Sequence, residues 1–347
     1  MCLLAPRGEV NGASSLRARA ANWYVARPSQ ADRNMSYPSE LLVAVVLAGL
    51  LLPLVFFALL AWRPMTRLGF ASALLSALSY QTLSHYLFPW SLVGLHTRWA
   101  MWALLFFALV RVRHLGVQPR WFPPSWWGRA AMALGFLGSL SSLGDAVDVV
   151  RSRNAPSDTV RVRSPLEAGT YTVQHGGATE STNHHHHVAA QRFALDVSRV
   201  NAWGARAGGL APKSVGQYYI FGTQVVAPCA GQVVALASDQ PDFAPGRFDA
   251  DVPLGNFIAL HCADSDITVV LAHLGRGTVQ SHLGAQVTPG DPLGRVGNSG
   301  NTSEPHLHVH AVRGRVTEPE QLLFTGDGVA LRVEGAFPVR NDRLVFR

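Results

Sequence analysis

The stretch that most constrains the fold is residues 297–310, which read GNSGNTSEPHLHVH. Up to its proline the stretch carries two glycines and two asparagines, so it predicts a loop that turns tightly. The remainder alternates polar and apolar residues, which predicts a strand with its histidines (His306, His308 and His310) on one face and its apolar residues on the other. Two imidazoles one strand repeat apart can share a site in which one binds a metal and its neighbour contacts the substrate.

This motif resembles the C-terminal signature of the LytM/lysostaphin-type zinc metallopeptidases, which cut peptide bonds in bacterial cell-wall peptidoglycan. The resemblance implies that His308 is a zinc ligand and that His306 is a catalytic histidine. It extends back to about residue 164, which implies a mainly-β peptidase domain over residues 164–347 with its core at about 164–325. Short alternating or β-branched runs separated by Gly- and Pro-bearing turns agree with this fold class. They lie at 169–173, 192–197, 224–227, 232–237, 256–262, 267–273 and 293–296.

The resemblance also implies the other two ligands of a single Zn²⁺ ion. Asp196, in the run QRFALDV, matches the carboxylate ligand of the family. The histidine that usually precedes it by four residues is replaced by Arg192, which cannot bind a metal. In one branch of the family an N-x-H element precedes a QRxALD strand, and by that spacing His185 is the third ligand. The choice among the four consecutive histidines at 184–187 stays open.

A second catalytic histidine is implied by the run VVLAHL, which places His273 at a strand end. Strict alternation puts His273 on the same face as Leu271. The chain has no HExxH helix, no GxSxG elbow and no catalytic Cys/His setting, so a zinc-activated water is the expected nucleophile. His310 is expected to be structural.

Cys229 and Cys262 both lie at expected strand ends, and they can form a disulfide if those strands are neighbours.

The first half of the chain has a different character, because it holds the longest apolar runs. Residues 41–62 contain no charged side chain and are long enough to cross a bilayer as a helix. Further runs at 68–88, 90–110 and 130–147 follow, flanked by Trp and Arg residues typical of membrane interfaces. We therefore expect four transmembrane helices within residues 41–150, a linker at 151–163, and contact with the lipid bilayer.

The basic residues predict the orientation in the membrane. Arginines concentrate in the segments after the first and third apolar runs, and positive segments stay on the cytoplasmic side. With translation from Met35 rather than Met1, both termini are expected outside, and the segment before residue 41 is then short. The expected location is the bacterial inner membrane with the peptidase domain in the periplasm. Because clustered Arg and stacking aromatics are not interleaved, the net charge of +7 does not indicate nucleic-acid binding.

Together these features predict a membrane-anchored zinc endopeptidase acting on peptidoglycan peptides. Arg192 keeps a second hypothesis open, in which an inactive LytM-like module binds or activates other cell-wall hydrolases. A third hypothesis is a membrane signalling or transport protein with a ligand-sensing β domain. It is weaker, because the apolar runs lack the paired buried charges of a transport path.

Overall fold

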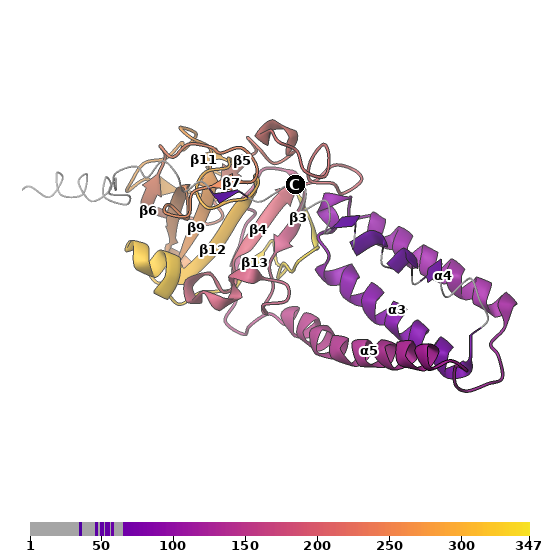
Figure 1. Ribbon diagram of the computed structural model, residues 1–347. Coiled ribbons are helices and arrows are strands. Elements are labelled where there is room, and N and C mark those ends of the chain that lie inside the picture. Colours follow the sequence, from indigo (N-terminus) through magenta and orange to yellow (C-terminus); the bar gives the residue numbers. More distant parts are fainter. Residues whose placement is uncertain (1–34, 37–45, 48, 52, 56, 59–64) are drawn as a thin grey trace, which may run out of the picture.

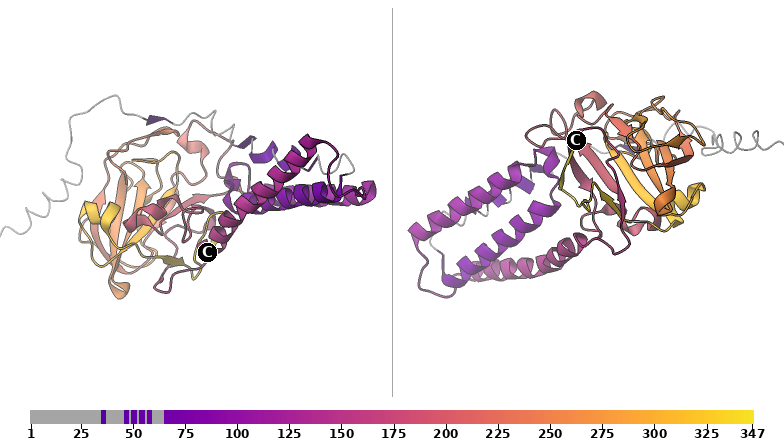
Figure 2. Two further views of the ribbon diagram at one scale, coloured as in Figure 1. Left: turned by 60° about the horizontal axis from the view of Figure 1, so that its bottom comes forward. Right: turned by 180° about the vertical axis from the view of Figure 1, so that it is seen from behind.

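A β domain and a group of long helices make up the molecule (Figure 1). The computed structural model describes residues 35–36, 46–47, 49–51, 53–55, 57–58 and 65–347. The helices α3 (Arg67–Leu87), α4 (Thr97–Leu115) and α5 (Trp126–Ser152) project from one side of the β domain, as two further views also show (Figure 2).

The β domain is built on one antiparallel sheet of eight strands in the order β10-β6-β8-β9-β12-β4-β3-β14. Its strands are β3 (Gly169–His175), β4 (Leu195–Arg199), β6 (Gly231–Ala237), β8 (Asn256–Cys262), β9 (Ile267–Leu274), β10 (Gln286–Val287), β12 (Leu307–Arg313) and β14 (Arg343–Phe346). Three two-stranded sheets accompany it: β5 (Gln224–Val226) with β11 (Pro292–Arg295), β2 (Val160–Val162) with β13 (Leu331–Val333), and β1 (Met35–Ser36) with β7 (Arg247–Phe248). The predicted β-rich C-terminal region is thus confirmed.

Strand β12 lies at the centre of the sheet between β9 and β4. Leu307, Val309 and Ala311 are buried in the larger apolar core. His308 and His310 point to the opposite face, where Ala272 and Val312 belong to a second core. The predicted alternation of β12 is confirmed, and it places His308 and His310 on the face of the sheet that also carries the second core.

The end of β9 departs from the predicted alternation. His273 has a φ of 63°, in the left-handed region, and the pairing with β8 skips it between Ala272 and Leu274. Such a bulge inserts one unpaired residue and reverses the facing of the residue after it. Leu274 therefore joins the same core as Leu271, while the His273 ring turns to the other face and lies 4.8 Å from the His306 ring. The expectation that His273 shares the face of Leu271 is wrong for this reason.

The structure also departs from the expected bounds at the start of β4, in the expected linker and after the expected core end. β4 begins at Leu195 rather than at residue 192, because Ala189–Gln191 form a 3₁₀ turn (η3). β2 lies inside the expected linker at 151–163, and α5 continues into that linker to Ser152. β14 lies beyond the expected core end at residue 325 and pairs with β3 at the sheet edge.

Three of the four expected apolar helices lie within the described residues. α3 matches 68–88, α5 extends 130–147 at both ends, and α4 begins seven residues later than 90–110 because Trp90–Leu92 form a 3₁₀ turn (η1). Most of the run 41–62 falls outside the described residues. Among the described helices, α5 alone is both long and apolar enough to cross a membrane.

Helices α3 and α5 pack through small residues. Ser72 Oγ donates to Met132 O at 2.8 Å and Ser76 Oγ donates to Gly135 O at 3.1 Å, while a Cβ on Gly135 would lie 2.3 Å from Ser72 Oγ. Small side chains and hydroxyl–carbonyl hydrogen bonds thus let the two helices approach closely.

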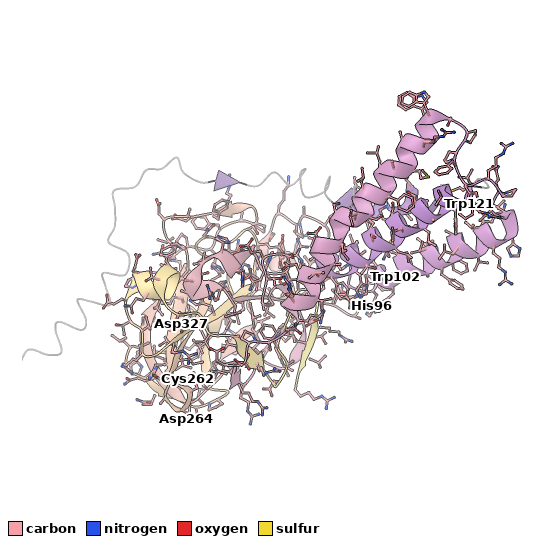
Figure 3. All side chains as sticks on the ribbon, turned by 90° about the horizontal axis from the view of Figure 1, so that it is seen from below. His96, Trp102, Trp121, Cys262, Asp264 and Asp327 are labelled. Carbon is pink, nitrogen blue, oxygen red and sulfur yellow. A yellow bond between two sulfur atoms is a disulfide. The ribbon has the colours of Figure 1, made fainter. Side chains whose placement is uncertain are left out.

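Cys229 and Cys262 form a disulfide, with Cα atoms 5.8 Å apart. Cys229 precedes β6 and Cys262 ends β8, and these two strands pair. Cys262 lies in the part of the β domain remote from the helices (Figure 3). The two cysteines therefore meet the condition set by the sequence, because their strands are neighbours in the sheet.

Candidate metal and catalytic site

Asp196 and His308 face each other across two neighbouring strands. They are cross-strand partners of β4 and β12, and His308 Nδ1 lies 2.9 Å from Asp196 Oδ1. Both side chains are buried, with 4% and 2% exposure. Two rigid strands therefore fix two candidate ligands at the centre of the sheet.

His185 reaches the same carboxylate from a short turn, η2 (His184–His187). Its Nε2 lies 3.0 Å from Asp196 Oδ2. The turn is held by Asn183, which is fully buried and accepts the backbone N–H of His185 through Oδ1. Asn183 Nδ2 also donates to the carbonyls of Gly177, Arg192 and Ala194, so it ties η2 to the residue preceding β4.

His186 and His187 belong to none of the candidate metal groups found among the described residues, whereas His184 packs against His185 and comes close to Asp196 as well. His186 Nδ1 lies 3.2 Å from the carbonyl of Arg192, and His184 and His187 are exposed. Arg192 itself is exposed and contributes its backbone carbonyl to the Asn183 contact. Within the run, His185 therefore has the 3.0 Å contact to Asp196 and shares a candidate metal group with Asp196 and His308.

His273 and His306 both turn their Nε2 atoms towards this cluster. His273 Nδ1 lies 2.9 Å from Ser299 O, and His306 Nδ1 lies 2.8 Å from Glu304 O. A carbonyl oxygen can only accept a hydrogen bond, so both rings carry a proton on Nδ1, and Nε2 is an acceptor whenever the ring is neutral. His306 Nε2 lies 3.5 Å from Asp196 Oδ1. All five predicted site residues thus lie together.

The loop at 297–305 places these two carbonyls. Gly300 has a φ of 83°, and a Cβ there would lie 2.3 Å from Gly255 N, so the loop can approach its neighbour only with glycine at this position. Ser299 Oγ donates to Leu274 O, beside the bulge. The Glu304 carboxylate forms a two-pronged ion pair with the buried guanidinium of Arg206.

Three groups of described residues have ligand atoms close enough to hold a metal, each within 4.8 Å. They are His185, Asp196 and His308; His273, His306 and His308; and His175, His184 and Asp196. In the last group Arg340 Nη1 lies 3.3 Å from His175 Nδ1. Because a guanidinium only donates, His175 Nδ1 is an acceptor and its Nε2 carries the proton, which leaves no free lone pair for a metal. Burial lowers the pKa of His175 to about 2, which agrees with a neutral ring.

The group of His185, Asp196 and His308 fits zinc best. It combines two imidazole nitrogens with one carboxylate, a donor set that zinc binds in catalytic sites while keeping one position open. It also uses Asp196, whose buried negative charge needs a compensating cation. His273 and His306 lie beside this group without belonging to it.

The charges around Asp196 act on one another. Burial by itself raises the pKa of Asp196, but the neighbouring His185 and His306 rings hold it well below its usual range. Burial opposes protonation of His306, yet Asp196 raises the pKa of that ring. Burial, together with His306 and His308, lowers the pKa of His273 well below its usual range. Asp196 is therefore a carboxylate anion throughout the neutral pH range.

Sequence reasoning missed the residues that hold the site in place. The sequence marks Asn183 as part of the N-x-H motif but does not reveal its hydrogen bonds. The roles of the Ser299 and Glu304 carbonyls cannot be predicted from residue types, because every residue has a backbone carbonyl. His310 was predicted to be structural, although its place on the face of His308 is visible in the alternation. Its ring contacts His308 directly, with 3.0 Å between His308 Nε2 and His310 Nδ1.

Residues 218–319 match the model of Peptidase family M23, which identifies a domain of this type within the C-terminal region. The matched segment contains His273, His306 and His308, whereas His185 and Asp196 precede it. No curated protein matches the chain.

Several solved structures are similar to part of the chain. The antimicrobial peptidase lysostaphin from Staphylococcus simulans is 18% identical, with 42% of this chain and 44% of that chain covered and a TM-score of 0.26. Csd3 from Helicobacter pylori is 14% identical, with 55% and 36% covered and a TM-score of 0.25. A zinc-containing peptidase from Vibrio cholerae is 15% identical, with 46% and 37% covered and a TM-score of 0.23. The chain spans less than half the length of each of these structures.

Proposed function

We propose that this protein is a membrane-anchored zinc endopeptidase that hydrolyses peptide bonds of bacterial peptidoglycan. One observation carries the proposal: His185, Asp196 and His308 converge on one point, and two further imidazoles, each held through Nδ1 by a backbone carbonyl, lie beside it. The match of residues 218–319 to Peptidase family M23 supports a metallopeptidase and a peptidoglycan substrate.

His185, Asp196 and His308 would hold the ion. Zinc, when bound, supplies Lewis-acid activation of water and of the scissile carbonyl at neutral pH. A neutral His273 or His306 ring can accept a proton from water at Nε2, because its own proton lies on Nδ1 and donates to a backbone carbonyl. A ring that has accepted this proton can then donate it to the oxyanion or to the leaving amine.

The helices support the membrane-anchored part of the proposal. A row of large apolar side chains is exposed along α5 and winds round the helix; Leu134, Leu137, Leu140 and Leu143 are 58–68% exposed. Such a row is unfavourable in water and is satisfied by lipid. The contacts between α3 and α5 through serine and glycine favour the same environment.

The test is digestion of purified peptidoglycan by the full chain in detergent, followed by muropeptide analysis and a measurement of zinc content. We expect about one tightly held zinc ion per chain and chelator-sensitive cleavage of peptide bonds. The His308→Ala variant is the matched control and should show neither. Zinc content near zero with no cleavage would favour the inactive, hydrolase-activating module instead.

A further inference from the structure

His310 lies outside the proposed ligands and catalytic residues, but it is buried, with 1% exposure, and forms a link from His308 to the protein backbone. His308 Nε2 lies 3.0 Å from His310 Nδ1, and His310 Nε2 lies 2.9 Å from the carbonyl of Leu322 in the turn η6 (Gln321–Thr325). Three groups from two elements thus stand in a row.

The protons in this row can be assigned from the carbonyl at its end. Leu322 O can only accept, so His310 Nε2 must carry a proton. A neutral His310 then has a lone pair on Nδ1, which requires a donor at His308 Nε2. With its one proton on Nε2, His308 keeps a lone pair on Nδ1, facing Asp196 Oδ1 at 2.9 Å. Two acceptors at that distance repel each other unless a cation binds both of them.

We infer that His310 is a positioning residue that makes Nδ1 the metal-binding nitrogen of His308, by accepting the His308 Nε2–H and donating to Leu322 O. The inference rests on the proposed function only in that the cation is taken to be zinc.

The opposite proton arrangement is less favourable. If His308 Nδ1–H donated to Asp196, His308 Nε2 would face His310 as an acceptor, and His310 would need protons on both nitrogens to satisfy His308 and Leu322. That places a charged imidazolium in a buried position, which is costly. The hydrogen bonds from His308 to His310 and from His310 to Leu322 O therefore disfavour donation from His308 Nδ1 to Asp196. They favour a metal ion between His308 Nδ1 and Asp196.

The test compares two substitutions in the full chain. The amide of His310→Gln can accept from His308 and donate to Leu322, whereas His310→Leu fills the space but leaves the His308 donor without a partner. Because outer-shell partners of a metal-bound histidine contribute roughly 10–100-fold to metal affinity, we expect His310→Leu to weaken zinc binding by that factor. His310→Gln should retain affinity within about threefold, since it keeps both hydrogen bonds. Zinc affinity is measured by competition with a chromogenic chelator, and folding by thermal unfolding of the metal-free proteins.

A spectroscopic measurement does not depend on either variant folding. In zinc-loaded wild-type protein labelled with ¹⁵N-histidine, the His308 ring should show a proton on Nε2 and none on Nδ1, assigned by its loss in His308→Gln. A proton on Nδ1, or equal zinc affinity for His310→Leu and wild type, would overturn the inference while leaving the proposed function intact. A wild-type chain that binds no zinc would instead overturn the proposed function.

Discussion

At the scale of single residues, backbone carbonyls decide what the imidazoles can do. The rings of His273, His306 and His310 each donate a hydrogen bond to a backbone carbonyl. The acceptors are Ser299 O, Glu304 O and Leu322 O, respectively. Because a carbonyl cannot donate, each contact fixes one ring nitrogen that carries a proton. The imidazole side chains are the reactive groups, and the loops that carry these carbonyls determine how each ring is oriented and protonated.

Four of the five site residues should separate into two groups by their effect on zinc binding. Asp196→Ala and His308→Ala should abolish zinc binding, because each removes a ligand held on a rigid strand. His306→Ala and His273→Ala should keep the zinc yet lower turnover by roughly 10²–10⁴-fold, the usual contribution of general acid–base catalysis. Zinc content and muropeptide release are measured on the same samples. Loss of zinc in His273→Ala would move that residue into the ligand set.

Within the four-histidine run, substitutions at neighbouring positions should have unequal effects. His185→Ala should weaken zinc binding by more than ~100-fold, beyond the range of an outer-shell change, because its Nε2 is the run's contact to Asp196 in the candidate zinc group. His186→Ala is the matched control and should bind zinc like wild type, since its ring contacts the Arg192 carbonyl. The reverse pattern would reassign the ligand to His186.

At the scale of elements, β12 was predictable and the end of β9 was not. The alternation of residues 306–310 reports facing directly, since side chains on a strand have period two. A bulge breaks that period at a single residue. Position 273 is a histidine and not a glycine, so nothing in the sequence indicates its left-handed backbone. The strand β14 was missed for a different reason: its four residues lie far along the chain from β3, and pairing partners cannot be deduced from alternation.

The bulge at His273 makes a prediction about stability. A left-handed backbone is disfavoured for most side chains, and Asn tolerates it while β-branched residues do not. His273→Asn should therefore unfold at nearly the wild-type temperature, whereas His273→Val should be less stable than His273→Asn by about 1–2 kcal/mol. Thermal unfolding of the metal-free chains in detergent measures the difference. Equal stabilities would mean that the left-handed backbone at position 273 is not maintained in solution.

At the scale of the whole molecule, the β domain contacts one end of the helices. Asn341 Nδ2 donates to Tyr86 O and Phe88 O at the end of α3, Arg206 N donates to Ser91 O, and Ala178 N donates to Ser152 O at the end of α5. Trp121 lies at the opposite end of the helices, and His96 lies at the end near the β domain (Figure 3). The segments that begin α3, end α4 and begin α5 carry the arginines of that opposite end: Arg67, Arg111, Arg113, Arg120 and Arg129.

This arrangement leads to the last prediction, which concerns topology. Because arginine-rich ends of membrane helices stay in the cytoplasm, the β domain at the other end should lie outside it. A reporter that is active only outside the cytoplasm should therefore be active when fused after residue 160, and the chain should stay in the membrane fraction after high-salt washing. The Cys229–Cys262 disulfide provides a second readout, since disulfides form and persist in oxidising compartments. Trapping of free thiols in intact cells should find both cysteines oxidised. A cytoplasmic reporter that is active at this position, together with free thiols at Cys229 and Cys262, would contradict both the topology and access to peptidoglycan.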